Sequence, residues 1–138
     1  MDDLLERLNR RPWRFTPQRR AVVDALAGAN VHLSADQVLE RVHQALPDTS
    51  RATVYNVLNE LVELGEVGEL NVAGRARTYD PNAADKHHHL LCEACGLLQD
   101  VQLEPGTEPR LSTAVLAFEL RRFDVLFSGV CADCRPAP

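Results

Sequence analysis

Two Cys-x-x-Cys pairs are the residues of this sequence with the most specific chemistry. Cys92 and Cys95 lie in the middle of the chain, and Cys131 and Cys134 lie near its C-terminus. Four thiolates in two such pairs are typical ligands of a tetrahedral Zn2+ ion, and a closed four-thiolate site leaves no open position for catalysis. We therefore predict a structural zinc site. The alternatives are two reducible disulfides or unrelated buried cysteines, which a reducing compartment disfavours.

A run of three histidines precedes the first cysteine pair. In a strand over residues 87–92, alternation puts His87 and His89 on one face and His88 and Cys92 on the other. Asp100, on the strand predicted after the first cysteine pair, would return a carboxylate to the face of His87 and His89. Imidazole and carboxylate without thiolate suit Fe(II) or Mn(II), so we predict a second metal site here. The alternative is a solvated, histidine-rich loop.

Composition limits the classes of protein to which the chain can belong. With 138 residues, 45% of them hydrophobic, it can form one domain or two small ones. Neither a long apolar run nor a signal-peptide pattern is present, which predicts a soluble cytoplasmic protein without a membrane partner. The net charge of −5 argues against nucleic acid, but residues 7–20 hold six arginines and no acidic residue. This stretch is either a solvated helix face or part of a nucleic-acid interface.

The order of elements over residues 1–82 predicts a winged helix-turn-helix domain. We expect helices over residues 2–9, from Thr16-Pro17 to Gly28, from Ser34 to Leu46 and from Ser50 to Leu64. Two strand-like runs, 66–72 and 75–80, joined by Ala73-Gly74, follow as the wing.

The fourth helix is the expected recognition helix, because the last helix before the wing enters the major groove in such domains. Its outward side chains, together with the arginine-rich stretch, predict contacts to double-stranded DNA. The predicted DNA-contacting residues are Arg14, Arg19, Arg51, Thr53, Tyr55 and Asn56. The alternative is a set of polar residues on a solvent face.

Residues 83–138 form a second, smaller unit, so that the whole chain is an α+β protein. Strands are expected over residues 87–92, 97–103, 118–120 and 123–130, with a short helix over 111–117. A unit of this size commonly needs a metal or a partner chain for stability.

The sequence resembles the ferric uptake regulator (Fur) family of metal-responsive repressors over nearly its whole length. The resemblance rests on five segments: residues 14–19 (RFTPQR), His32 before Ser34-Ala35-Asp36, residues 52–55 (ATVY), residues 87–96 (HHHLLCEACG) and residues 129–134 (GVCADC). It implies a homodimer in which the cysteine pairs hold zinc in the dimerisation domains. A regulatory metal between the domains would allow binding to an inverted-repeat operator. The regulatory ligands implied by the resemblance are His32, Asp80, His87, His89 and Asp100.

Two positions resemble the peroxide-sensing branch (PerR) of this family. Asp100 stands where iron-responsive members usually have Glu, and Asn56 follows Tyr55 where they usually have Arg. In that branch, bound Fe(II) reacts with peroxide and oxidises ligand histidines, which here would be His32 and His87. The alternative keeps the fold but responds to the supply of iron, manganese or zinc.

A third metal site, present in many members, is not expected to be complete. The chain has no histidine after His89, and Arg121 and Arg122 occupy the region where a further histidine often stands. His88 is then a spare or partial ligand, and His43 is expected on the surface.

Two other classes of function compete with that of a repressor. Two histidines and a carboxylate resemble the facial triad of non-haem iron oxygenases. Five protein donors would leave no room for a substrate, so we do not expect an enzyme. A zinc-stabilised interaction module without DNA binding is the third possibility.

Overall fold

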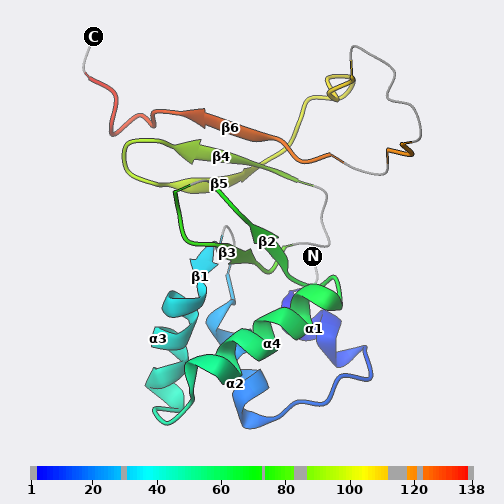
Figure 1. The fold of residues 1–138 in the computed structure, drawn as a ribbon, viewed down its shortest axis with the longest axis vertical. Helices are drawn as coiled ribbons and strands as arrows, with labels where there is room; N and C mark the ends of the chain where they lie inside the picture. Colours follow the sequence, from blue (N-terminus) through cyan, green and yellow to red (C-terminus); the bar gives the residue numbers. More distant parts are fainter. Residues whose placement is uncertain are drawn as a thin grey trace. The chain divides into compact units, whose positions relative to one another are not determined.

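The computed structural model describes residues 3–28, 31–72, 74–82, 87–111, 118–120 and 123–136. The chain divides into two units, Met1–Asp85 and Lys86–Pro138 (Figure 1). Among the helices that these residues form, none has the length and apolar composition that crossing a membrane requires.

The first two helices of the N-terminal unit begin at capping side chains. In α1 (Leu4–Asn9), the Asp3 carboxylate accepts a hydrogen bond from the Glu6 N–H at 2.8 Å. In α2 (Pro17–Ala25), the Thr16 hydroxyl accepts from the Arg19 N–H at 3.1 Å, and proline occupies the first helical position. The predicted start of α2 is therefore correct, but the helix ends at Ala25 rather than near Gly28.

The next two helices begin at serines. Ser34 and Gln37 form a reciprocal capping box at the start of α3 (Ala35–Ala45), with distances of 3.2 and 2.9 Å. Ser50 caps α4 (Arg51–Glu63) and accepts from the Thr53 N–H at 3.1 Å. Gly65, just beyond the C-terminus of α4, has a φ of 76°, a left-handed conformation that glycine adopts without steric cost.

The helices enclose an aliphatic core, to which the wing contributes one large aromatic side chain. Tyr79, from β3 (Thr78–Asp80), is 1% exposed. The other largest fully buried side chains are Leu8, Val22, Leu26, Val38, Val42, Val54, Leu58, Leu61 and Val67. Since α1 through α4 all supply buried residues, the position of the recognition helix is set by this shared core.

The wing is a three-stranded sheet with the order β1-β3-β2. The strands β2 (Gly68–Leu70) and β3 form an antiparallel pair, shorter than the two predicted runs. Their predicted connection includes Ala73, which lies outside the described residues. The strand β1 (Leu33–Ser34) pairs with β3 through Leu33 and Tyr79. A two-residue strand is too short to show a period of two, so the sequence pattern did not reveal it.

A buried carboxylate ties the first helix to the wing. Glu66 is 7% exposed, and its two oxygens lie 2.6 Å from Arg7 Nε and 2.9 Å from Arg11 Nε. Arg7 also donates to the carbonyl oxygen of Pro81 at 2.6 Å. Two of the six N-terminal arginines therefore serve the fold of this unit.

The C-terminal unit is a second three-stranded sheet, with the order β5-β4-β6. The central strand β4 (His88–Cys92) is antiparallel to β5 (Leu98–Val101) and parallel to β6 (Leu126–Gly129). The predicted strand over residues 118–120 is wrong: these residues form no strand, and Phe118 and Leu120 are 72% and 68% exposed. Apolar alternation alone does not provide the neighbouring strand that pairing needs. Residues 112–117 of the predicted helix lie outside the described residues.

We expect Glu66→Gln to destabilise the N-terminal unit by about 2 kcal/mol, because two arginines, one largely buried, would lose their carboxylate partner. The matched control is Glu69→Gln, which breaks the more exposed pair with Arg77 and should cost below about 0.5 kcal/mol. Denaturant unfolding followed by helical circular dichroism measures both. Equal losses of unfolding free energy in the two variants would show that the buried Glu66 pairs stabilise the unit no more than the exposed Glu69 pair.

Candidate metal centres and nucleic-acid interface

The four cysteines form one cluster. Cys92 ends β4, Cys95 lies in the turn that follows, and Cys131 and Cys134 follow β6. Because Cys92 pairs with Gly129 in the parallel β4–β6 register, the two Cys-x-x-Cys segments leave the sheet side by side. The four sulfur atoms all lie within 4.8 Å of one another.

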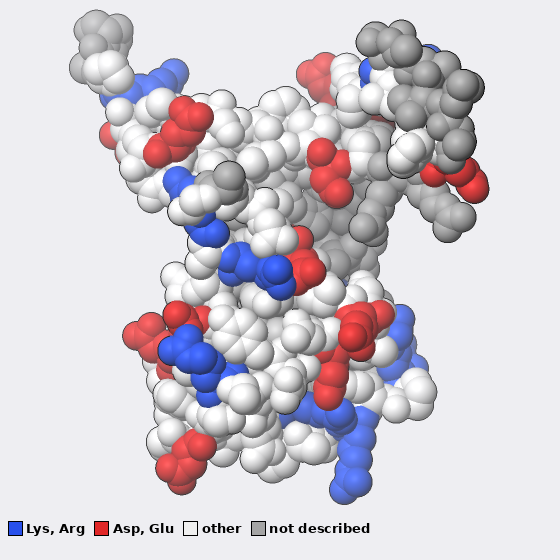
Figure 2. Space-filling model, viewed as in Figure 1, with Lys and Arg blue, Asp and Glu red and all other residues white. Residues whose placement is uncertain are grey.

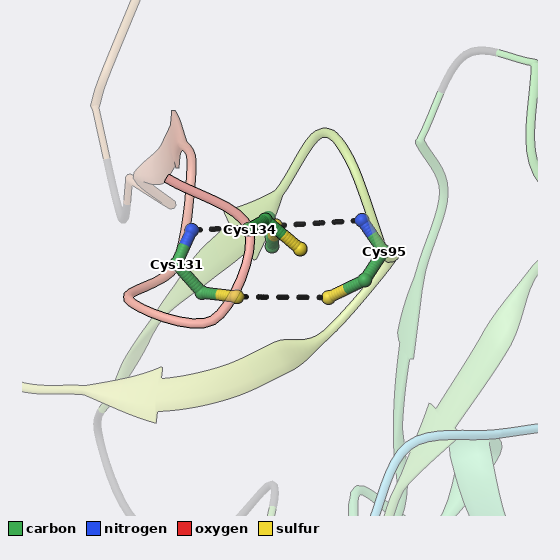
Figure 3. A group of neighbouring side chains, drawn as sticks. Cys95, Cys131 and Cys134 are labelled. Carbon is green, nitrogen blue, oxygen red and sulfur yellow. Dashed lines mark hydrogen bonds between the residues drawn. The ribbon is translucent and has the colours of Figure 1, made fainter. Parts of the chain in front are cut away.

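The spacing of the sulfur atoms matches a tetrahedral metal site. Cys95 Sγ lies 3.8 Å from Cys131 Sγ, and these two side chains point toward each other (Figure 3). Four ligands about 2.3 Å from a tetrahedral Zn2+ lie about 3.8 Å apart, whereas a disulfide would need about 2.05 Å. All four cysteines are free thiols, so the structure does not contain the alternative pairing into disulfides.

Hydrogen bonds within the cluster lower the pKa of one cysteine and raise that of another. The backbone N–H groups of Cys131 and Cys95 both donate to Cys92 Sγ at 3.4 Å, which lowers the pKa of Cys92 to about 6. Hydrogen bonds with the thiols of Cys131 and Cys95 raise the pKa of Cys134 to about 12. The cluster therefore favours a thiolate at Cys92 near neutral pH, and a metal would have to displace the protons of Cys95 and Cys134, whose pKa values are raised.

Two of the three consecutive histidines, His87 and His89, lie close to the carboxylate of Asp100. Asp100 Oδ1 lies 3.4 Å from His87 Nε2 and 3.5 Å from His89 Nε2. The cross-strand pairing of His89 with Asp100 positions the carboxylate, and the two imidazole rings are 4.9 Å apart. This arrangement gathers two imidazole nitrogens and a carboxylate oxygen within the C-terminal unit.

His88 occupies the opposite face of β4. Its Nδ1 accepts a hydrogen bond from the Val125 N–H at 3.1 Å, and its ring stacks on Phe123 at 5.4 Å with an interplanar angle of 7°. The residue is only 5% exposed. His88 therefore packs in the small core of this unit, and the structure gives no support to a role as a spare metal ligand.

The remaining two predicted ligands lie together in the N-terminal unit. His32 precedes β1 and Asp80 ends β3, so the β1–β3 pairing brings His32 Nε2 to 3.3 Å from Asp80 Oδ2. The other oxygen of Asp80 accepts from the Asn82 N–H at 2.8 Å, which orients the carboxylate. His43 is exposed, with Nε2 2.8 Å from the Thr49 carbonyl oxygen, as expected of a surface residue.

Four of the predicted DNA-contacting residues line one groove. It has a volume of about 380 Å³ and runs between the start of α2 and α4. The predicted residues on it are Arg14, Arg19, Thr53 and Asn56. Tyr55, on α4, is 40% exposed, and Arg51 is paired with Asp36 at the start of α3.

Arg19 is held in place by three neighbours. Its guanidinium lies 4.8 Å from the centroid of the Trp13 ring and 3.0 Å from the Glu60 carboxylate, and it donates to the Arg14 carbonyl at 2.6 Å. Arg19 thus connects the segment before α2 to α4. Trp13 and Glu60 were not singled out from the sequence, because neither lies in a recognisable motif.

Acidic side chains accompany most arginines of the N-terminal unit. Besides the pairs of Arg7, Arg11 and Arg19, Arg20 lies 3.0 Å from Asp24. On the face drawn in Figure 2, basic and acidic side chains lie next to each other. Four of the six arginines in residues 7–20 therefore lie beside carboxylates of the same unit, a pairing that the charge pattern along the sequence does not show.

With this geometry in place, comparison with known proteins assigns the family. The model of the ferric uptake regulator family matches residues 10–121. The chain belongs to this family. The transcriptional regulator FurA of Mycobacterium tuberculosis is 35% identical over 133 residues, covering 96% of this chain and 90% of that protein. The peroxide-responsive repressor PerR of Staphylococcus aureus is 29% identical over 136 residues, covering 98% and 91%.

Solved structures show the same fold. The ferric uptake regulator Fur of Helicobacter pylori has a TM-score of 0.71 at 22% identity and covers 99% of each chain. The Campylobacter jejuni peroxide stress regulator has a TM-score of 0.66 at 27% identity and covers 97% of this chain and 100% of that one. The protein is thus a metal-responsive transcriptional regulator with a winged-helix DNA-binding domain and a C-terminal domain.

We expect His88→Ala to destabilise the C-terminal unit by about 2 kcal/mol, because the stacking on Phe123 and the acceptor for the Val125 N–H are both lost. The number of metal ions bound per chain should not change. Thermal unfolding and elemental analysis measure the two quantities, with His43→Ala as the surface control. Loss of a bound metal at an unaltered unfolding temperature would instead identify His88 as a ligand.

Proposed function

We propose that this protein is a homodimeric repressor that binds an inverted-repeat DNA operator when its regulatory site holds Fe(II) or Mn(II). The observation that carries the proposal is the convergence of His87, His89 and Asp100. One carboxylate oxygen lies within 3.5 Å of an imidazole nitrogen from each histidine. A nitrogen and oxygen donor set without thiolate suits Fe(II) and Mn(II) and differs from the chemistry of the cysteine cluster.

The His32–Asp80 pair would complete the regulatory site. Its imidazole and carboxylate, 3.3 Å apart, are of the same donor types as the three ligands in the C-terminal unit. Donors shared between the two units would couple metal binding to the orientation of the winged helices. Only one orientation of the two recognition helices in a dimer can match the spacing of two operator half-sites, so the metal would select the DNA-binding state.

The cysteine cluster would hold the structural Zn2+. Its support is the 3.8 Å separation of Cys95 and Cys131 sulfurs and the gathering of all four within 4.8 Å. Such a site supplies folding free energy to a unit whose own core is small.

We further propose that the regulatory site senses hydrogen peroxide. Asp100 and Asn56, the two positions that resemble the peroxide-sensing branch, support this assignment, and the similar proteins include the peroxide regulators of Staphylococcus aureus and Campylobacter jejuni. The 35% identity to FurA is higher than the 29% identity to PerR, so overall similarity does not favour that branch. The competing function is a response to iron, manganese or zinc availability without histidine oxidation.

Oxidation of His32 or His87 would release the DNA by removing a ligand. Bound Fe(II) would supply the redox chemistry that activates hydrogen peroxide. In the net reaction, one peroxide oxygen atom enters an imidazole C–H bond in a two-electron oxidation, and the other leaves as water. The oxidised ring is a poorer donor, so the ligands in the two units would no longer be held together.

We expect equimolar peroxide to add one oxygen atom to His32 or His87 in the Fe(II)-loaded protein and to neither in the Mn(II)-loaded protein. Fragment-ion mass spectrometry locates the added oxygen. His43 and His88 are internal controls, since neither is a proposed ligand. If the Fe(II)-loaded protein gains no oxygen at His32 or His87 but still requires metal for DNA binding, it responds to metal supply.

We expect the purified protein to contain one zinc ion per chain, and Cys95→Ser to lose it together with cooperative unfolding of the C-terminal unit. Asp133→Asn is the matched control, because Asp133 is an exposed residue between Cys131 and Cys134. Elemental analysis and thermal unfolding measure both effects. Retention of zinc by Cys95→Ser would contradict the four-thiolate site.

A further inference from the structure

The recognition helix α4 carries very little positive charge. Arg51 is its only basic residue, while Glu60 and Glu63 are acidic, so the helix has a net charge of +1 − 2 = −1. Attraction to DNA phosphates therefore cannot come from α4 as a whole. Arg51 is the single cation of this helix. Whether it is paired or available to DNA therefore has a large influence on what the helix recognises.

Arg51 is engaged by a carboxylate of a different helix. It is the first residue of α4, and its Nη1 is paired with an Oδ atom of Asp36, in the first turn of α3. Both side chains are well exposed, at 61% and 66%. An exposed pair of this kind contributes little to folding stability. The pair instead positions the Arg51 guanidinium at the N-terminal end of the recognition helix.

Asp36, the acidic member of the pair, lines a groove between the helices and the wing. The groove has a volume of about 470 Å³ and is also lined by Tyr55 of α4 and Asn71 and Arg77 of the wing. Arg77 is held in the same manner, since it donates to Asn71 at 2.9 Å and lies 3.2 Å from Glu69. Asp36 and Glu69 are thus paired with Arg51 and Arg77, and their negative charges oppose the approach of phosphates that lack a compensating contact.

We propose that Asp36 is a specificity-determining residue of the DNA-binding domain, which holds Arg51 for a guanine edge and withholds it from the phosphates of other sequences. The inference rests on the proposed DNA binding. The N-terminal residues of a recognition helix reach base edges in the major groove, and arginine binds O6 and N7 of guanine through two N–H groups. The pairing with Asp36 engages Nη1 of the guanidinium and leaves other N–H groups for the base.

The test measures the affinity of the full-length Mn(II)-loaded protein for two DNA duplexes by fluorescence anisotropy. One duplex is selected from a random library with the wild-type protein, and the other is a scrambled sequence of equal composition. The variants are Asp36→Asn, Arg51→Ala and the double variant. Asp24→Asn is the matched control, because it also frees an arginine, Arg20, from an exposed pair, here within α2.

We expect Asp36→Asn to strengthen binding to the scrambled duplex and to reduce the ratio of the two affinities by about fivefold or more, the lower end of what a bidentate arginine–guanine contact supplies. The salt dependence of scrambled-duplex binding should steepen by about 0.9 in log–log slope, the value for one added phosphate contact. Asp24→Asn should leave the affinity ratio unchanged. In the Arg51→Ala background, Asp36→Asn should have no further effect on the ratio.

A base-analogue experiment locates the contact. Replacing the guanines of the selected duplex one at a time by 7-deazaguanine removes the N7 acceptor. One position should weaken binding of the wild type but not of Arg51→Ala. The inference is overturned if Asp36→Asn changes both affinities equally, if its effect persists without Arg51, or if no guanine shows this dependence. If the wild type binds neither duplex with metal, the proposed DNA-binding function fails as well.

Discussion

The register of β4 is the constraint on which both candidate ligand clusters of the C-terminal unit depend. Pairing with β5 sets His89 opposite Asp100, and pairing with β6 sets Cys92 beside Gly129, from which the second cysteine pair follows. Because alternate side chains of a strand point to opposite faces, a slip of one residue would remove His89 from Asp100 and separate the cysteine pairs at the same time. Burial of His88 against Phe123 on the other face of the strand stabilises this register.

The two centres divide their chemistry by donor type. Four thiolates with restricted spacing form a closed site, whose metal would have a structural role. Imidazole and carboxylate donors at the other end of β4 suit metals that bind more weakly and exchange with the cellular supply. On the proposed function, one short strand therefore links the ligands of a structural metal to ligands of a metal whose occupancy would change. In a regulator, this separation lets a signal act on one metal without loss of the fold.

Arginine–carboxylate pairs connect different elements of the N-terminal unit. Glu66 ties α1 to the wing, Glu60 ties Arg19 to the recognition helix, and Asp36 engages the only cation of that helix. The chain thus combines a net charge of −5 with membership of a family of DNA-binding regulators. On the proposed DNA-binding face, carboxylates would hold arginines at defined positions until a matching ligand displaces or complements the carboxylate.

Local signals in the sequence determined the helix starts, the cysteine pairs and the alternation of the histidines. Capping by Thr16, Ser34 and Ser50 acts within three residues, and strand alternation acts within two, so both are visible without a fold. The strand β1, the lack of a strand at residues 118–120 and the packing of His88 depended on partners distant in the chain. The same holds for the partners of Arg19 and Arg51, because a carboxylate 41 or 15 residues away becomes a neighbour only when helices pack. Tertiary structure alone decided which charges were already satisfied and which ligands shared a face.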